Sequence, residues 1–313
     1  MLIRNLLAPL ALLLVNSAWA APFAYVPNEG SGTLSVIDTA TDQVVGEIKA
    51  GTKPRGTVIS LDGSRAYVSD QPNNRLLMLD LKTRQPAGQI ALGESPEGLG
   101  LSPDGRWVVA AIEESKEVVF VDTRSQTKAF VVAVKGKNPE HAVFSPDGAQ
   151  VFVSAEEGEA VDVIDVATRR QIGQVPVGAR PRGIGFSPDG ARAYVAAENS
   201  SEVYVIDRAS LTVAAKIPAG LRANGIAVSP DGLQVYISNG GAASVSVLDA
   251  RTLQIVATIA VGQRPWNMAL TPDGRKLYVA CGRSGAVSVV DTETRAKLSD
   301  IAVGKLPWGV AIR

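Results

Sequence analysis

The stretch GIGFSPDGARAYVAAENSSEVYVID, residues 183–207, recurs along the chain with small variations. GIAVSPDGLQVYISNGGAASVSVLD follows at residues 225–249, and NMALTPDGRKLYVACGRSGAVSVVD at 267–291. The starts of these three stretches are 42 residues apart (225 − 183 and 267 − 225). A repeat of this length is typical of solenoids and propellers, in which each unit packs only on its neighbours.

One repeat contains short alternating runs of apolar residues separated by turn residues, which is the pattern of β-strands. In the turn Pro188-Asp189-Gly190, the proline constrains φ and the aspartate side chain caps the turn. The glycine adopts the positive φ that a tight turn needs. Four strands fit into each unit, as in one propeller blade. The aspartate that ends the third strand recurs seven times, at Asp38, Asp80, Asp122, Asp165, Asp207, Asp249 and Asp291. The sequence therefore predicts an all-β, seven-bladed β-propeller of four-stranded antiparallel blades.

The Pro-Asp-Gly or Leu-Asp-Gly turn occurs only six times, which predicts how the ring closes. FAYVPN, at residues 23–28, matches a second strand, and PWGVAIR, at residues 307–313, matches a first strand. We therefore expect the C-terminal strand to pair with the N-terminal blade. Such pairing covers a sheet edge that would otherwise be exposed.

Residues 1–20 are typical of a secretory signal peptide. Arg4 precedes the apolar run LLAPLALLLV, and Ala18 and Ala20 are the small residues expected before a cleavage site. The apolar run is too short to span a membrane. We expect cleavage after Ala20, a propeller domain over residues 21–313, and a monomer in the periplasm without a membrane span.

The composition excludes several kinds of site. The chain has 31 basic and 31 acidic residues, which argues against general binding of nucleic acid. It has one histidine, one cysteine and no CxxCH motif for haem attachment. A lone histidine is a weak basis for a metal site or a Ser-His-Asp triad. We expect no metal, no cofactor and no catalytic residues.

The repeated pattern PDGxxxYVA…VSVID resembles the YVTN-type β-propeller repeat over residues 22–313. In its layout the chain is similar to the propeller proteins associated with pyrroloquinoline-quinone (PQQ)-dependent alcohol catabolism. The resemblance implies a role beside a quinone-dependent dehydrogenase, a cytochrome or a transporter component.

Residues that differ between blades are the candidates for function, because a site needs asymmetry. One such position follows the proline of the GxxP lead-in to each first strand, on the face around the channel mouth. Around the ring it holds Arg55, Glu97, Glu140, Arg182, Asn224, Trp266 and Trp308. Arg222 and Arg264 lie two residues earlier in their blades, and His141 follows Glu140.

These residues predict a basic, aromatic arc and an acidic arc on one face. Arginine and tryptophan suit a small anionic ligand, and carboxylates suit a basic protein partner. His141 with Glu140 is a candidate metal ligand or base, although we expect a rim histidine without chemistry. Three functions stay open: a non-enzymatic binding propeller, a redox or other enzyme subunit with a cofactor at the channel face, and a nucleic-acid-binding propeller. We expect the first.

Overall fold

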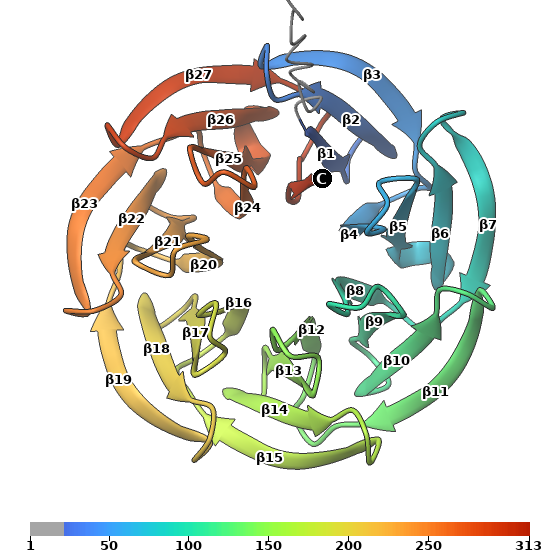
Figure 1. Ribbon diagram of the computed structural model, residues 1–313, viewed down its shortest axis with the longest axis horizontal. Coiled ribbons are helices and arrows are strands. Elements are labelled where there is room, and N and C mark those ends of the chain that lie inside the picture. The colour runs from blue at the N-terminus through green and yellow to red at the C-terminus, as the bar shows by residue number, and fades with distance from the viewer. Residues whose placement is uncertain (1–21) are drawn as a thin grey trace, which may run out of the picture.

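The computed structural model describes residues 22–313 and shows seven four-stranded sheets arranged around a central channel (Figure 1). Neighbouring strands within every sheet are antiparallel. The predicted seven-bladed propeller is therefore confirmed. The predicted signal peptide lies outside the described residues. Within residues 22–313, no helix has the length and apolar character needed to cross a bilayer.

The inner half of each blade consists of a strand along the channel and the strand next to it. The channel strands are β4 (Pro54–Ile59), β8 (Pro96–Leu101), β12 (Pro139–Phe144), β16 (Pro181–Phe186), β20 (Ala223–Val228), β24 (Pro265–Leu270) and β28 (Ala311–Ile312). The second strands are β1 (Phe23–Asn28), β5 (Arg65–Asp70), β9 (Trp107–Ile112), β13 (Gln150–Ala155), β17 (Arg192–Ala197), β21 (Gln234–Asn239) and β25 (Lys276–Cys281).

The outer half of each blade reaches the circumference of the disc, and two short 3-10 helices follow second strands. The third strands are β2 (Thr33–Asp38), β6 (Arg75–Asp80), β10 (Glu117–Asp122), β14 (Ala160–Asp165), β18 (Glu202–Asp207), β22 (Ser244–Asp249) and β26 (Ala286–Asp291). The outermost strands are β3 (Gln43–Lys49), β7 (Gln85–Ala91), β11 (Thr127–Ala133), β15 (Arg170–Pro176), β19 (Thr212–Pro218), β23 (Gln254–Ala260) and β27 (Ala296–Ala302). The 3-10 helices are η1 (Gln71–Asn73) and η2 (Gly282–Ser284).

The two ends of the propeller domain meet in one blade, as the six turns predicted. β28 pairs with β1, and the backbone N–H of Phe23 donates to the Arg313 carbonyl at 2.9 Å. Figure 1 shows the C-terminus beside β1. The first strand of this blade is short, and its other contacts with β1 include the Asn28–Pro307 bridge. Pairing of these strands closes the ring.

The core lies between the blades. Seven buried apolar clusters each join two neighbouring sheets, so that every blade is covered on both faces. Phe120 on β10, for example, packs edge-on against Phe144 on β12 of the next blade, with 6.2 Å between ring centroids. Burial on both faces explains the nearly continuous apolar runs in the second and third strands.

The repeated aspartates stabilise turns, as expected of scaffold residues. Asp207 accepts hydrogen bonds from the backbone N–H of Ser210 at 2.9 Å and from its hydroxyl at 2.8 Å. The corresponding carboxylates of the other six blades also accept from turn N–H groups. These seven side chains therefore stabilise the turns that follow the third strands.

The channel strands approach one another so closely that most blades require glycine there. A Cβ added at Gly56 would lie 2.5 Å from the carbonyl oxygen of Glu97 in the next blade. The equivalent position is also glycine at Gly98, Gly183, Gly225 and Gly309. The remaining two blades carry His141 and Asn267, so only these two side chains of that ring can project into the channel region.

Candidate functional site at the channel mouth

The structure brings most of the predicted site residues together around one cavity. The cavity has a volume of about 290 Å³ and lies at the mouth of the channel. The predicted residues that line it are Arg55, Glu140, Arg182, Arg264, Trp266 and Trp308. Glu97 lies directly behind Arg55, to which it is ion-paired, whereas Arg222 is about half exposed at the edge.

Arg55 on β4 is held by carboxylates on both sides. Its guanidinium pairs with Glu97 on β8, and with Glu29 at 3.4 Å. Gln71 donates to the same Glu97 oxygen at 2.9 Å. The Glu97 side chain has no exposed surface, and its second oxygen, Oε2, has no hydrogen-bond partner.

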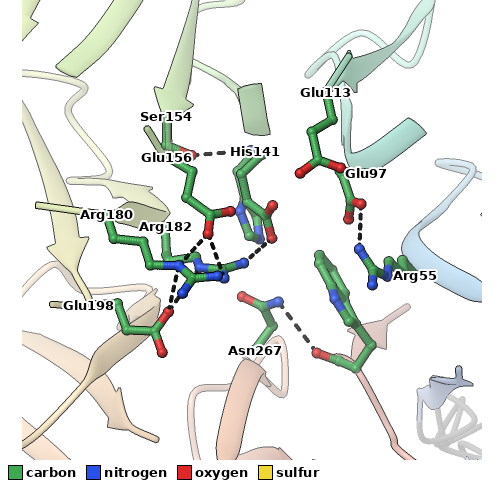
Figure 2. Close-up of polar contacts among 12 residues, drawn as sticks. Arg55, Glu97, Glu113, His141, Ser154, Glu156, Arg180, Arg182, Glu198 and Asn267 are labelled. Carbon is green, nitrogen blue, oxygen red and sulfur yellow. Dashed lines mark hydrogen bonds and ion pairs between the residues drawn. The ribbon is translucent and has the colours of Figure 1, made fainter. Parts of the chain in front are cut away.

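Arg182 on β16 is the centre of a second ion-paired group (Figure 2). It pairs with Glu140 on β12, with Glu156 at 3.1 Å and with Glu198 at 3.1 Å. Arg180 contacts the same Glu156 and Glu198 carboxylates. One guanidinium thus joins three carboxylates from two neighbouring blades.

Glu198 also forms ion pairs with arginines of the two following blades. Its carboxylate lies 2.7 Å from Arg264 and 3.8 Å from Arg222. This pairing corrects the expectation of separate basic and acidic surfaces. The arginines and carboxylates lie on adjacent blades and at different depths of one mouth, where attraction between opposite charges brings them into contact.

The sequence reasoning missed Glu29, Gln71 and Glu198. They belong to a second ring, formed by the residue directly after each second strand. This ring holds Glu29, Gln71, Glu113, Glu156, Glu198, Gly240 and Gly282. Comparing that position between blades would have found them, because it varies as strongly as the position after the proline. The glycines make room: Trp266 packs against Gly282, where an added Cβ would lie 2.5 Å from the indole.

His141 lies inside the channel region rather than at an open rim, which corrects the predicted position. A cavity of about 150 Å³ adjoins the mouth and is lined by His141, Asn267, Trp308 and Arg55, among others. The imidazole stacks on the Trp308 indole, with 5.3 Å between centroids and 16° between planes. Both ring nitrogens are buried, and the Asn267 side chain lies beside the ring. Burial lowers the pKa of His141, so the ring is neutral at pH 7.

The carboxyl groups of the mouth differ in their affinity for protons. Burial and the neighbouring charge of Glu140 raise the pKa of Glu97 to about 8. Burial likewise raises the pKa of Glu156 to about 7. Burial alone would raise the pKa of Glu140, but the charge of Arg182 outweighs it and the pKa lies below its usual range. The carboxyl groups of the mouth therefore differ in how readily they ionise, and burial and the neighbouring arginines set the difference.

Other reactive side chains do not extend this site. Cys281 is buried, and burial raises the pKa of its thiol. In the part of the chain that the structure describes, no group of three or more His, Cys, Asp or Glu side chains could hold a metal ion. The chemistry available at the mouth consists of paired carboxylates and guanidiniums, a neutral imidazole and two indoles.

A protein-family model described as "YNCE-like beta-propeller" matches residues 6–312. The chain belongs to this family. Comparison with curated proteins found no significant match. The YNCE-like fold is shared with solved structures of low sequence identity, which establish the architecture alone.

Three solved structures illustrate this likeness. Hydrazine synthase of Kuenenia stuttgartiensis is 22% identical, with 91% of this chain and 99% of that chain covered and a TM-score of 0.80. A functionally unknown protein from Desulfotomaculum acetoxidans DSM 771 is 18% identical, with coverages of 93% and 98% and a TM-score of 0.83. The dihydro-heme d1 dehydrogenase NirN, in complex with DHE, is 16% identical, with coverages of 94% and 75% and a TM-score of 0.68.

Proposed function

We propose that this YNCE-like propeller binds a small polar ligand at the channel mouth and does not transform it. The observation that carries the proposal is the concave mouth of about 290 Å³, in which charged side chains from several blades converge beside two indoles. Its lining includes Arg55, Glu140, Arg182, Trp266 and Trp308. Charged and aromatic side chains that converge in a cavity are suited to hold a small polar molecule.

A small ligand fits the mouth better than a protein surface does. The charged groups are recessed: the side chain of Arg182 is 15% exposed, and that of Glu140 is 4% exposed. A flat or convex partner could not reach them, whereas a molecule of a few heavy atoms can enter the cavity. Concave sites with a few converging polar groups are typical of small-molecule binding.

The ion pairs favour binding over catalysis. Glu97, Glu140 and Glu198 are each fixed in orientation by ion pairs with guanidiniums, and no serine or cysteine nucleophile lines the mouth among residues 22–313. The imidazole of His141 contacts an indole, and neither of its nitrogens contacts a carboxylate. The proposed role is that of a ligand-binding subunit.

We place this binding role in the periplasm, beside PQQ-dependent alcohol oxidation. The signal-like segment of residues 1–20 and the resemblance to propellers of that pathway support the setting. In it, the propeller would carry a ligand to or from a quinone-dependent dehydrogenase, a cytochrome or a transporter component.

The test is to incubate the purified propeller with the small-molecule fraction of a periplasmic extract, remove unbound material, and record native mass spectra. We expect one small molecule per chain, released with its mass unchanged. Trp308→Ala, which opens the wall shared by both cavities, should retain much less. Glu114→Gln, an exposed change outside the mouth, should behave like the parent. Absence of any retained molecule, or equal retention by the Trp308 variant, would contradict the proposal.

A further inference from the structure

We infer that the propeller has a second binding site, which takes an exposed β-turn of a partner protein with proline first, an acidic residue second and glycine third. The site is a gap in a ring of turns, at the blade where Figure 1 shows the C-terminus beside β1. The channel strands begin at the mouth and end at this ring, so the gap lies on the opposite face. None of its residues lines the channel mouth, and the inference is independent of the proposed function.

Six turns, each joining a first strand to a second strand, form the ring. They begin at Leu61, Pro103, Pro146, Pro188, Pro230 and Pro272, and each continues with Asp-Gly. The first residue of one turn packs against the glycine of the next. A Cβ added at Gly232 would lie 2.9 Å from Cδ of Pro188, and one added at Gly274 would lie 3.0 Å from Cδ of Pro230. The same contact occurs at Gly105, Gly148 and Gly190.

Among residues 22–313, the blade of β28 and β1 has no such turn, and the contact is missing on both sides of it. A Cβ added at Gly63, in the following blade, would meet no atom within 4 Å. Pro272, in the preceding blade, has no glycine of a next turn to pack on. Gly63 and Pro272 line one cavity of about 1020 Å³, more than three times the volume of about 290 Å³ at the channel mouth.

The missing piece has the size of one turn. Strand pairing places Arg313 and Pro22 of the closing blade at the positions of Ser60 and Ser64 in the next blade. In that next blade, Leu61, Asp62 and Gly63 stand between these two positions. The six filled places therefore show which chemistry fits the seventh. The turns of a second copy are held between neighbours in their own ring, whereas a hairpin that projects from a partner can enter the gap.

The apolar lining of the gap is suited to the proline of such a turn. Phe23, at the start of β1, and Leu61, in the neighbouring turn, are 37% and 40% exposed. Pro22, Pro272 and Ile312 complete the apolar part of the lining. A partner's proline over Gly63 would repeat the contact found in the filled places and would cover this surface.

The basic side chains of the gap are suited to the acidic residue of the turn. In the six turns, a hydroxyl just before the turn donates to the aspartate, as Thr271 does to Asp273 at 2.6 Å. Arg313 occupies that hydroxyl position in the closing blade, and Arg275 lines the gap without a side-chain ion pair or hydrogen bond among residues 22–313. Asp62 and Asp273 also line it, but each accepts hydrogen bonds from its own turn. An incoming carboxylate can therefore pair with the two guanidiniums.

The probe is a hairpin peptide with the sequence of residues 186–194, FSPDGARAY, flanked by two cysteines that form a disulfide and labelled with fluorescein. Its binding to the propeller in the predicted mature form, residues 21–313, is followed by fluorescence anisotropy. We expect saturable binding of one peptide per chain. Pro188→Ala or Asp189→Asn in the peptide should each weaken binding at least about fivefold, because an apolar contact or a charge-assisted hydrogen bond is lost.

Variants of the propeller assign the binding to the gap. Ala40 is exposed in the turn after β2 and lines the cavity, so Ala40→Trp should fill the gap and remove saturable binding. Ala209→Trp, at the same position after the third strand of another blade, is the matched control and should bind like the parent. Arg275→Gln should weaken the parent peptide but change the Asp189→Asn peptide little, since the second peptide has no carboxylate to lose.

Four outcomes would overturn the inference. The first is the absence of saturable binding up to the solubility limit of the peptide. The second is equal binding of the parent, Pro188→Ala and Asp189→Asn peptides. The third is an equal effect of Ala40→Trp and Ala209→Trp, with both proteins folded by circular dichroism. The fourth is binding that Trp308→Ala abolishes and Ala40→Trp retains, which would assign the peptide to the channel mouth.

Discussion

At the residue scale, identical residues in every blade support the scaffold, whereas two variable positions in each blade build the mouth. The aspartates that end the third strands accept hydrogen bonds from their own turns in all seven blades. The position after the proline instead alternates between arginine, glutamate, asparagine and tryptophan. Variation within a repeat is thus what marks a site, because the fold itself constrains that position little.

Glu97 provides a prediction for stability. Burial raises its pKa from 4.5 to about 8, so the folded protein resists ionising it. The stability that this group contributes is fully present below about pH 4.5 and is lost as the pH rises to about 8, where the loss levels off. We therefore expect Glu97→Gln to become progressively more stable than the parent across this interval.

The measurement is the midpoint of urea unfolding at several pH values between 4.5 and 9. Glu114→Gln, an exposed carboxyl in the same blade, is the control and should follow the parent at every pH. Parallel curves for the parent and Glu97→Gln would show that Arg55 fully compensates the buried charge.

At the scale of single elements, the short strand β28 has two roles. Its pairing with β1 closes the ring, and the segment before it places Trp308 at the wall between the two cavities. The backbone N–H of Trp308 donates to the Pro27 carbonyl at 2.9 Å, which anchors this segment. Closure of the fold and formation of the site therefore depend on the same residues.

Deleting residues 307–313 should strongly destabilise the propeller. The deletion leaves backbone groups of β1 without partners and exposes a sheet edge. We expect a loss of several kcal/mol, a large part of the roughly 5–15 kcal/mol that stabilises a typical domain. Thermal unfolding followed by circular dichroism measures it. Trp308→Ala keeps the strand and should lose much less; equal losses would assign the effect to the indole.

At the scale of the whole molecule, stability is distributed around a closed ring. Each blade shares one apolar cluster with each of its two neighbours, so no blade is an end. An open array of repeats can lose its terminal units first. A closed ring has no terminal unit, and we expect it to unfold in one cooperative step.

Phe120→Ala tests this distribution. Phe120 is fully buried, stacks on Phe130 at 4.3 Å between centroids, and contacts Phe144 of the next blade. Its truncation should cost about 3–5 kcal/mol. Circular dichroism and tryptophan fluorescence should still report a single coincident transition in urea. Val44→Ala, on an exposed outer strand, should change stability by at most about 0.5 kcal/mol. Two separated transitions in the Phe120 variant would indicate blades that unfold independently.

The sequence by itself determined the architecture, because strand alternation and turn chemistry repeat in every blade. The 42-residue spacing, the seven aspartates and the six turns predicted the number of blades and the pairing of the two ends. It also identified the ring of Arg55, Glu97, Glu140, Arg182, Trp266 and Trp308, which differs from blade to blade.

Only the tertiary structure decided how those side chains pair and which atoms lack partners. Arg182 contacts Glu198 of its own blade and Glu140 of the neighbouring blade, and no local pattern predicts the choice. The position of His141 against Trp308 joins residues 167 apart (308 − 141), which meet because the ring closes. Long-range contacts and burial set the charge balance of the mouth, and both arise only when seven blades converge on one channel.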